Sequence, residues 1–247
     1  MTKTTAEIGE IWLRDGIYSE LILSEDEIKK YRNESRIMFK EKPNSPYDRP
    51  SNDSDIFKEL MKHPRVIELV EICMVAELKE KCKVDSIQDW MYMKPPGELG
   101  RDIHQNIFYT HANRGEIINT SIALDDADKG NGGLFIYPNS QHESCLPITI
   151  DEDRQKTNPD DWRNERGKPC VMPGNWIDGE WVDKYEKVYT NARAGSVSLI
   201  HSNIIHGSEE NKSEDRWRTA YLNAYIKQGA VFSEGGHMNR KRINVYD

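Results

Sequence analysis

The sequence predicts a mainly β fold with helices, an α+β arrangement in which a double-sheet jelly roll or barrel carries helical additions. Its length of 247 residues fits one large domain, 1–247, better than two independent domains. Apolar residues at helical spacing occupy the first third, about 1–83. From there to about 230, short apolar runs alternate with Gly, Asn, Asp and Pro, which is typical of many short strands joined by turns.

The helical part has a clear start signal. Ser24 and Glu27 form a capping-box pattern ahead of Ile28, so we expect a helix from there to about Ser35. The proline-rich segment 42–51 is predicted to be an exposed loop. Apolar residues at helical spacing on either side of His63-Pro64 predict two further helices that pack on the strands that follow.

The strand-rich part contains seven apolar runs of strand length. They are Ser86–Met93, Ile107–Thr110, Ile117–Leu124, Gly133–Tyr137, Val188–Asn191, Ser196–His201 and Thr219–Ile226. A highly charged stretch with Pro and Gly, about 150–180, interrupts them and is predicted to be a long inserted loop. Long loops in compact domains are often active-site lids.

Composition excludes several classes of partner. The net charge of −8 argues against nucleic acid, because phosphate binding needs a basic face, and the short basic run Asn239–Arg242 is expected to be solvated. No apolar run reaches the roughly 18 residues that a membrane span needs, and the N-terminus lacks the apolar core of a signal peptide. The four scattered cysteines are interpreted as reduced thiols, so a cytoplasmic location is expected.

Two histidine-containing segments about a hundred residues apart indicate a metal site. His104 and Asn106 stand two residues apart, and on a strand such residues point to the same side. With His206 from a second strand they would form one face of an ion's coordination shell. This is the geometry of the 2-His-1-carboxylate triad that holds non-haem Fe(II), except that Asn106 stands where the carboxylate belongs.

Longer motifs around these residues resemble a known family. The segments "YMKPPGELGRDIHQN", "NGGLFIYPNSQHES" and "AGSVSLIHSNIIHGSEENKSEDRWRTA" are similar to the phytanoyl-CoA dioxygenase family of Fe(II)/2-oxoglutarate-dependent oxygenases, and they come in the family's order. The N-terminal "LRDGIYSELILSEDEIKKY" is similar to that family too, so the resemblance covers nearly the whole chain. It implies a double-stranded β-helix, a cupin-like jelly roll, with N-terminal helices packed on one side.

The resemblance also implies roles for single residues. His104 and His206 would be the iron ligands, with Asn106 at the family's aspartate position. Arg218 matches the arginine that holds the distal carboxylate of 2-oxoglutarate. Two further residues match positions close to that co-substrate, Ser208 and Gln105. The implied reaction uses Fe(II), 2-oxoglutarate and O2, oxidises a small organic substrate and releases succinate.

Several residues compete for these roles. His201 precedes His206 by five positions, which places the two on opposite faces of a regular strand, and the Gly-Ser that follows His206 makes it the better ligand. Arg216 shares a strand face with Arg218, and the Thr-Ala after Arg218 favours the latter. Asp102 is a possible surrogate ligand two residues before His104. The acidic run Asp125–Asp128 lacks the spacing of a calcium-binding loop and is predicted to be a solvated turn.

The neutral side chain of Asn106 leaves three interpretations open. An amide oxygen can coordinate a cation but brings no negative charge, so iron should bind more weakly, by roughly 10–100-fold or more. In the first interpretation the protein is still a working oxygenase that hydroxylates a small organic substrate. In the second it is an impaired member that serves as a binding protein. In the third, the missing carboxylate leaves a position for chloride, and the protein is an oxidative halogenase.

Overall fold

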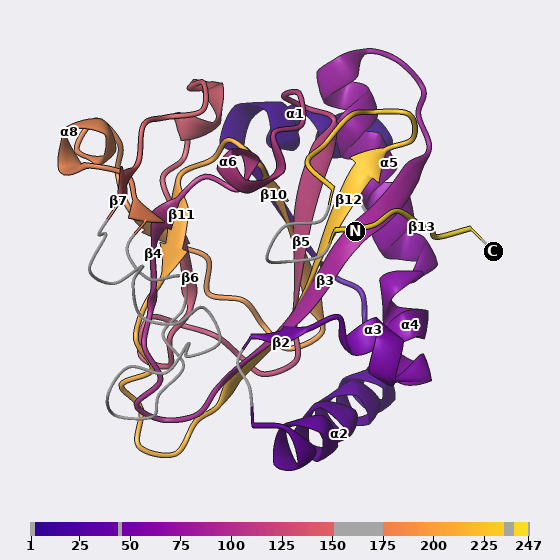
Figure 1. Cartoon of the computed structure of the whole chain (residues 1–247), viewed down its shortest axis with the longest axis vertical. Helices are drawn as coiled ribbons and strands as arrows, with labels where there is room; N and C mark the ends of the chain where they lie inside the picture. Colours follow the sequence, from indigo (N-terminus) through magenta and orange to yellow (C-terminus); the bar gives the residue numbers. More distant parts are fainter. Residues whose placement is uncertain (1–2, 44–45, 151–174, 235–239, 247) are drawn as a thin grey trace.

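Two antiparallel sheets face each other in the computed structural model, which describes residues 3–43, 46–150, 175–234 and 240–246 (Figure 1). The strands of the larger sheet, in spatial order, are β1 (Ile17–Leu21), β10 (Ser196–His201), β5 (Ile117–Ala123), β12 (Arg218–Lys227), β3 (Val84–Lys94) and β13 (Ile243–Asn244), with β2 (Tyr47–Asp48) also paired to β3. The smaller sheet runs β4 (Arg101–His104), β11 (His206–Ser208), β6 (Leu134–Ile136) and β9 (Val188–Tyr189). Two facing sheets of this kind form the predicted jelly roll, a double-stranded β-helix.

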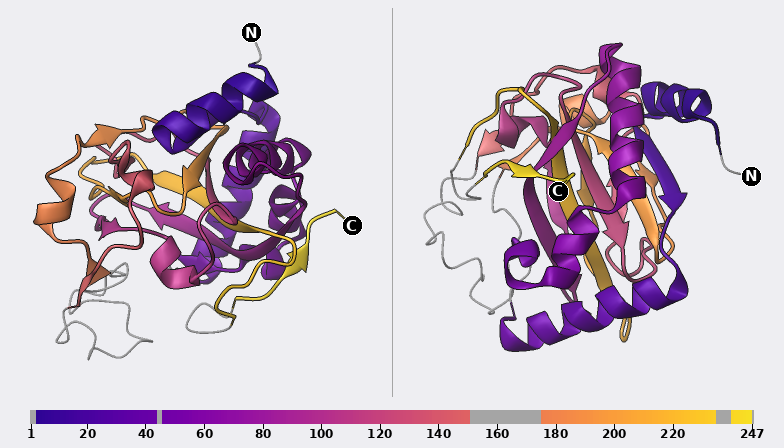
Figure 2. Two further views of the ribbon diagram at one scale, coloured as in Figure 1. Left: turned by 90° about the horizontal axis from the view of Figure 1, so that it is seen from above. Right: turned by 90° about the vertical axis from the view of Figure 1, so that its right-hand side faces the viewer.

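Helices cover the outer face of the larger sheet, away from the smaller one (Figures 1 and 2). They are α1 (Thr5–Asp15), α2 (Glu25–Glu41), α3 (Pro50–Asp53), α4 (Asp55–Met61) and α5 (Pro64–Leu78). The predicted capping box at Ser24 and Glu27 is present, and the helix that it starts continues six residues beyond Ser35. Shorter pieces elsewhere are α6 (Ile107–Thr110), α8 (Gly179–Val182), a 3-10 turn (Ser140–His142) and the strand pair β7 (Thr149–Ile150) and β8 (Asn175–Trp176).

The alternation of side chains along β12 divides the interior into two compartments. Tyr221 and Tyr225 face the helices: the Tyr221 ring stacks on Phe57 of α4 at 5.3 Å, and the Tyr225 hydroxyl donates to the backbone of Met61. Arg218 and Leu222, which alternate with Tyr221 along the strand, point to the opposite side, toward the smaller sheet. One face of the sheet therefore builds the apolar core, and the other face is left to line a pocket.

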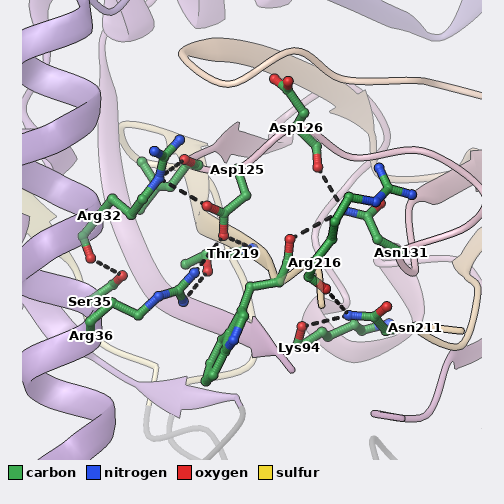
Figure 3. Close-up of polar contacts among 12 residues, drawn as sticks. Arg32, Ser35, Arg36, Lys94, Asp125, Asp126, Asn131, Asn211, Arg216 and Thr219 are labelled. Carbon is green, nitrogen blue, oxygen red and sulfur yellow. Dashed lines mark hydrogen bonds and ion pairs between the residues drawn. The ribbon is translucent and has the colours of Figure 1, made fainter. Parts of the chain in front are cut away.

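A polar cluster at the start of β12 ties that strand to α2 (Figure 3). Asp125 forms ion pairs with Arg32 and Arg36, both at 2.9 Å, and accepts a hydrogen bond from the Thr219 backbone at 3.0 Å. Its side chain is only 15% exposed, so the prediction that this acidic run is a solvated turn is wrong at this position. The cluster fixes the backbone directly after Arg218.

Three expectations about elements need correction. The first third is not wholly helical, because β1 and β2 join the larger sheet. The segment Ile107–Thr110 is the short helix α6, not a strand. Most of the predicted loop at about 150–180 lies outside the described residues, but its end contains β8 and α8. Within the described part of the chain, no helix has the length and apolar character needed to cross a bilayer.

Candidate active site

A pocket lies between the two sheets and draws its walls from both. From the larger sheet it is lined by Trp90, Tyr92, Asn119, Thr120, Ser121, Ile200, Arg218, Leu222 and Asn223. From the smaller sheet and the segments around it come Arg101, His104, Asn106, Tyr109, Thr110, Leu134, His206, Gly207, Ser208 and Arg240. Five of the six residues predicted for the site thus line one pocket, although they come from three separate segments of the chain.

Two neighbouring strands of the smaller sheet bring the two histidines together. His104 ends β4 and is paired in register with His206, the first residue of β11, and their ring centroids are 4.3 Å apart. Each ring directs its Nδ1 at a backbone carbonyl, that of Asp102 at 2.7 Å and that of Ile204 at 2.9 Å. Because a carbonyl only accepts, each Nδ1 carries the proton, and each Nε2 keeps a lone pair for a ligand.

Burial keeps both imidazoles uncharged at neutral pH. It lowers the pKa of His206 to about 4. Burial also lowers the pKa of His104 well below its usual range, and the neighbouring His206 and Arg101 lower it further. Neutral imidazole is the form that binds a metal ion, so no proton has to leave before a cation enters.

Gly207, between His206 and Ser208, allows three strands to lie close together. A Cβ at Gly207 would lie 2.5 Å from the Phe135 ring on one side and 2.9 Å from the Arg101 carbonyl on the other. Any larger residue would push β4 or β6 away from β11. The small side chain therefore keeps His104 and His206 in register.

Asn106 reaches the pocket by a different route from the one predicted. The strand ends at His104, and the backbone of Asn106 is already helical, at φ −67° and ψ −27°, as the residue that precedes α6. Strand alternation therefore does not place it. Its side chain nevertheless lines the same pocket and hydrogen-bonds to His104, which favours the charged form of that ring.

Arg218 is a buried cation with no counter-ion among the described residues. It is only 6% exposed, and its Nε has no hydrogen-bond partner among the described residues. Burial lowers its pKa to about 10, so the guanidinium is still charged at neutral pH. No Asp or Glu belongs to the described lining of the pocket. Since an uncompensated buried charge is costly, this geometry favours an anionic ligand beside Arg218.

A lysine that sequence reasoning missed lies beside this arginine. Lys94 is paired in register with Arg218, is fully buried, and donates from Nζ to the Ser208 hydroxyl at 2.8 Å and to the Glu209 carbonyl at 3.0 Å. Burial lowers its pKa well below the usual value, and the nearby Arg218 adds to this. The Ser208 hydroxyl is thus held between the lysine and the pocket. A lysine at an inward position of a buried strand was the available signal.

Gln105 has no place in the pocket lining. It is almost fully buried, and its amide donates to the backbone of Asn203 at 2.6 Å and of Ser144 at 3.1 Å, while its Oε1 accepts from the Leu146 backbone at 2.7 Å. All three partners are loop backbone groups. We therefore interpret Gln105 as a residue that fixes the loops behind the histidines, in place of the co-substrate contact that the resemblance implied.

Arg101 approaches the metal-facing nitrogen of His104. Its Nε donates to His104 Nε2 at 3.2 Å, and its guanidinium also contacts the Tyr92 hydroxyl. The same lone pair on Nε2 would be needed by a metal ion. Two neutral imidazoles and a free buried arginine fit an iron and 2-oxoglutarate site, provided that Arg101 releases His104.

The competing residues lie elsewhere. His201 faces the helices, with its Nε2 3.8 Å from a Glu77 carboxylate oxygen on α5. Arg216 forms an exposed ion pair with Asp128 at 2.6 Å. The side chain of Asp102 is not part of the described pocket lining. The described residues also contain no cluster of three or more His, Cys, Asp or Glu side chains arranged for a metal, so the candidate donors are the two histidines and the amide.

Comparison with known proteins identifies the family. The family model for phytanoyl-CoA dioxygenase matches residues 2–220, and the chain therefore belongs to the phytanoyl-CoA dioxygenase family, whose members use Fe(II), 2-oxoglutarate and O2. The predicted family and fold are confirmed. A search of curated protein sequences finds no significant match.

Solved structures with the same fold share little sequence with the chain. One is the epimerase SnoN in complex with Fe3+, alpha ketoglutarate and nogalamycin RO, with 16% identity, a TM-score of 0.69, and coverage of 92% of this chain and 84% of that one. The carbocyclase SnoK from nogalamycin biosynthesis has 19% identity, a TM-score of 0.67 and coverage of 93% and 88%. EctD from S. alaskensis with 2-oxoglutarate and 5-hydroxyectoine has 16% identity, a TM-score of 0.67 and coverage of 92% and 78%.

Proposed function

We propose that the protein is an Fe(II)- and 2-oxoglutarate-dependent oxygenase that hydroxylates a small organic substrate. The observation that carries this proposal is the presence, in one pocket, of two adjacent neutral imidazoles and a buried arginine that has no counter-ion among the described residues. Iron and 2-oxoglutarate, when bound, would supply the oxidising chemistry, in which O2 is consumed and the co-substrate is decarboxylated to succinate. The cytoplasm is the compartment that we propose for it.

The chain's own residues divide the work of holding these groups. His104 and His206 would ligate the metal through Nε2, with the Asn106 amide beside them. Arg218 would bind the distal carboxylate of 2-oxoglutarate, because a guanidinium offers two parallel N–H donors to a carboxylate. Ser208 would add its hydroxyl, which Lys94 orients.

A second candidate function, that of a binding protein, is favoured by two observations. Asn106 brings no negative charge to offset a divalent cation, and the positively charged Arg101 guanidinium donates a hydrogen bond to the His104 nitrogen that the metal needs. Both weaken metal binding in the same direction. The third candidate, a halogenase, would need open space at position 106, and the Asn106 side chain fills part of that space while hydrogen-bonded to His104.

Co-substrate turnover separates these candidates. Purified protein is incubated with Fe(II), 2-oxoglutarate and O2, and succinate is quantified for the native chain and for Asn106→Asp. Succinate from the native chain supports the oxygenase, whereas succinate from Asn106→Asp alone supports the binding protein. A chloride-dependent shift in the visible spectrum of the native iron complex would favour the halogenase. Absence of succinate from both proteins, when both are folded and loaded with iron, contradicts the proposal.

A further inference from the structure

Besides Arg218, the pocket lining contains further buried N–H donors that lack an acceptor among the described residues. Three of them are the indole Nε1 of Trp90, the amide Nδ2 of Asn119 and the guanidinium Nε of Arg240. Asn119 is only 6% exposed. Leaving a buried donor without an acceptor is unfavourable, so three of them in one pocket point to a ligand that accepts hydrogen bonds.

These donors lie at the other end of the pocket from Arg218. Trp90 on β3 is paired with Leu222 of β12, and Asn119 on β5 is paired with Ala224 of the same strand. Leu222 follows Arg218 by four residues, which is about 13 Å along a strand at roughly 3.3 Å per residue. The donors therefore form a subsite separate from the one that we assign to 2-oxoglutarate.

Arg240 is held at this second end by the backbone of its neighbour. The Lys241 amide donates to the Ile87 carbonyl on β3, three residues before Trp90. The charges that act on Arg240 come from Arg49 and Asp48, and they oppose each other. No carboxylate in the described lining of the pocket compensates the positive charge of Arg240, and the same lining contains two further arginines. This occurs in a chain with a net charge of −8, so the positive pocket is a local feature.

Apolar side chains also line the pocket. Leu134, Ile200 and Leu222 belong to its lining; Leu222 is paired with Trp90, and Leu134 is paired with Ser208 on β11. A ligand with an apolar body could lie against them while its acceptor group reaches the donors. The combination of an apolar wall and a cationic, donor-rich end describes an amphipathic organic anion.

We propose that the substrate is a small organic anion whose carboxylate or phosphate group is bound by Arg240, Asn119 and Trp90. Its apolar body then extends toward His104 and His206. The proposal rests on the proposed function in one respect, the assignment of Arg218 to 2-oxoglutarate. Binding of the anion itself requires no metal, and the two proposals can therefore fail separately.

The test is a calorimetric titration of the full-length, metal-free protein in the presence of a chelator. The probes are 3-phenylpropionate, 2-phenylethyl phosphate and the neutral 3-phenylpropanamide, which share an apolar body and differ in the head group. We expect at least one anion to bind at least about 10-fold more tightly than the amide. The better of the two anions identifies the head group as a carboxylate or a phosphate.

Variants locate the binding. Arg240→Gln should remove about 10-fold or more of the preference for the anion, and Trp90→Phe, which keeps an aromatic ring but loses the N–H, should remove about 3-fold. Lys241→Gln removes a positive charge from the exposed neighbouring residue and should leave the preference for the anion unchanged. Equal affinity for anion and amide, or no binding of any probe at about 10 mM, overturns the proposal. So does an anion preference that Arg218→Gln abolishes and Arg240→Gln leaves intact, because the probe then occupies the co-substrate site.

Discussion

At the scale of single residues, the charge at position 106 decides how firmly the site can hold a cation. The Asn106 side chain lines the pocket and touches His104, so a carboxylate at the same position would lie beside the same ion. We expect Asn106→Asp to tighten Fe(II) binding by about 10-fold or more, because the new negative charge offsets the metal. Equilibrium dialysis under argon measures this. An unchanged affinity would show that position 106 does not contact the metal.

The co-substrate depends on a different residue. Arg218→Gln should weaken 2-oxoglutarate binding by about 100-fold, since a charge-assisted, bidentate contact is replaced by a neutral one. Arg218→Lys should recover little, because an ammonium group cannot reproduce the guanidinium fork. The matched control is Arg216→Gln, which removes an exposed arginine paired with Asp128. Equal losses in the two glutamine variants, measured by calorimetry, would contradict the assignment.

Stability of the metal-free protein should depend on pH through the buried histidines. The pKa of His206 is lowered by burial to about 4, from an ordinary value near 6.5. Between these values the unfolded chain binds more protons than the folded one, so stability falls as the pH falls through this window. Urea unfolding at pH 7 and pH 5 measures the loss. His206→Asn should reduce the difference in unfolding free energy between pH 7 and pH 5, whereas His111→Asn, at an exposed position, should leave it unchanged. The same difference in both variants would be inconsistent with this account.

Sequence patterns predicted which residues line the pocket better than they predicted the residues that support them. His104, Asn106, His206, Ser208 and Arg218 were selected by pattern and resemblance, and all of them line one pocket. Sequence reasoning missed Lys94, which orients Ser208, because a buried lysine is rare and its burial depends on tertiary contacts.

The basic run Asn239–Arg242 shows the same limit. It was expected to be solvated, but Arg240 lines the pocket. Charge runs are usually exposed, and only the path of the chain after β12 brings this arginine inward. Local composition contains no information about that path.

At the scale of elements, short strands were the hardest to predict. β10 and β12 contain long apolar runs and were predicted within one residue at each end. The strands that carry the histidines, β4 and β11, have four and three residues and show no alternation that could be recognised. Ile107–Thr110 has strand-like composition, yet it forms a helical turn, because the chain must leave β4 at the edge of the pocket. Tertiary context overrides local propensity there.

The ion-pair cluster between α2 and β12 should contribute to stability and to the position of Arg218. Asp125→Asn removes the charge shared by Arg32 and Arg36 and weakens the bond to the Thr219 backbone (Figure 3). We expect a loss of about 1–3 kcal/mol in the free energy of unfolding, measured with urea. Exposed Asp128→Asn serves as the control and should cost less. A larger loss in the control would contradict the importance of the buried cluster.

At the scale of the whole molecule, the fold separates stability from chemistry. One face of the larger sheet packs on helices through an apolar core, and the other face, together with the smaller sheet, forms the pocket. The resemblance implied this architecture, but it did not indicate that β1 joins the edge of the larger sheet beside β10. That pairing links residues about 180 positions apart, and short sequence windows cannot detect it.

The central claim is that His104, His206 and Arg218 together hold an iron chelate of 2-oxoglutarate. An anaerobic titration of the metal-free protein with Fe(II) and 2-oxoglutarate tests it most directly, because the chelate has a visible charge-transfer band. The account predicts the band in the native protein, a stronger band at equal iron in Asn106→Asp, and no band in His206→Ala. Absence of the band from both the native protein and Asn106→Asp, with circular dichroism showing that both are folded, would contradict it.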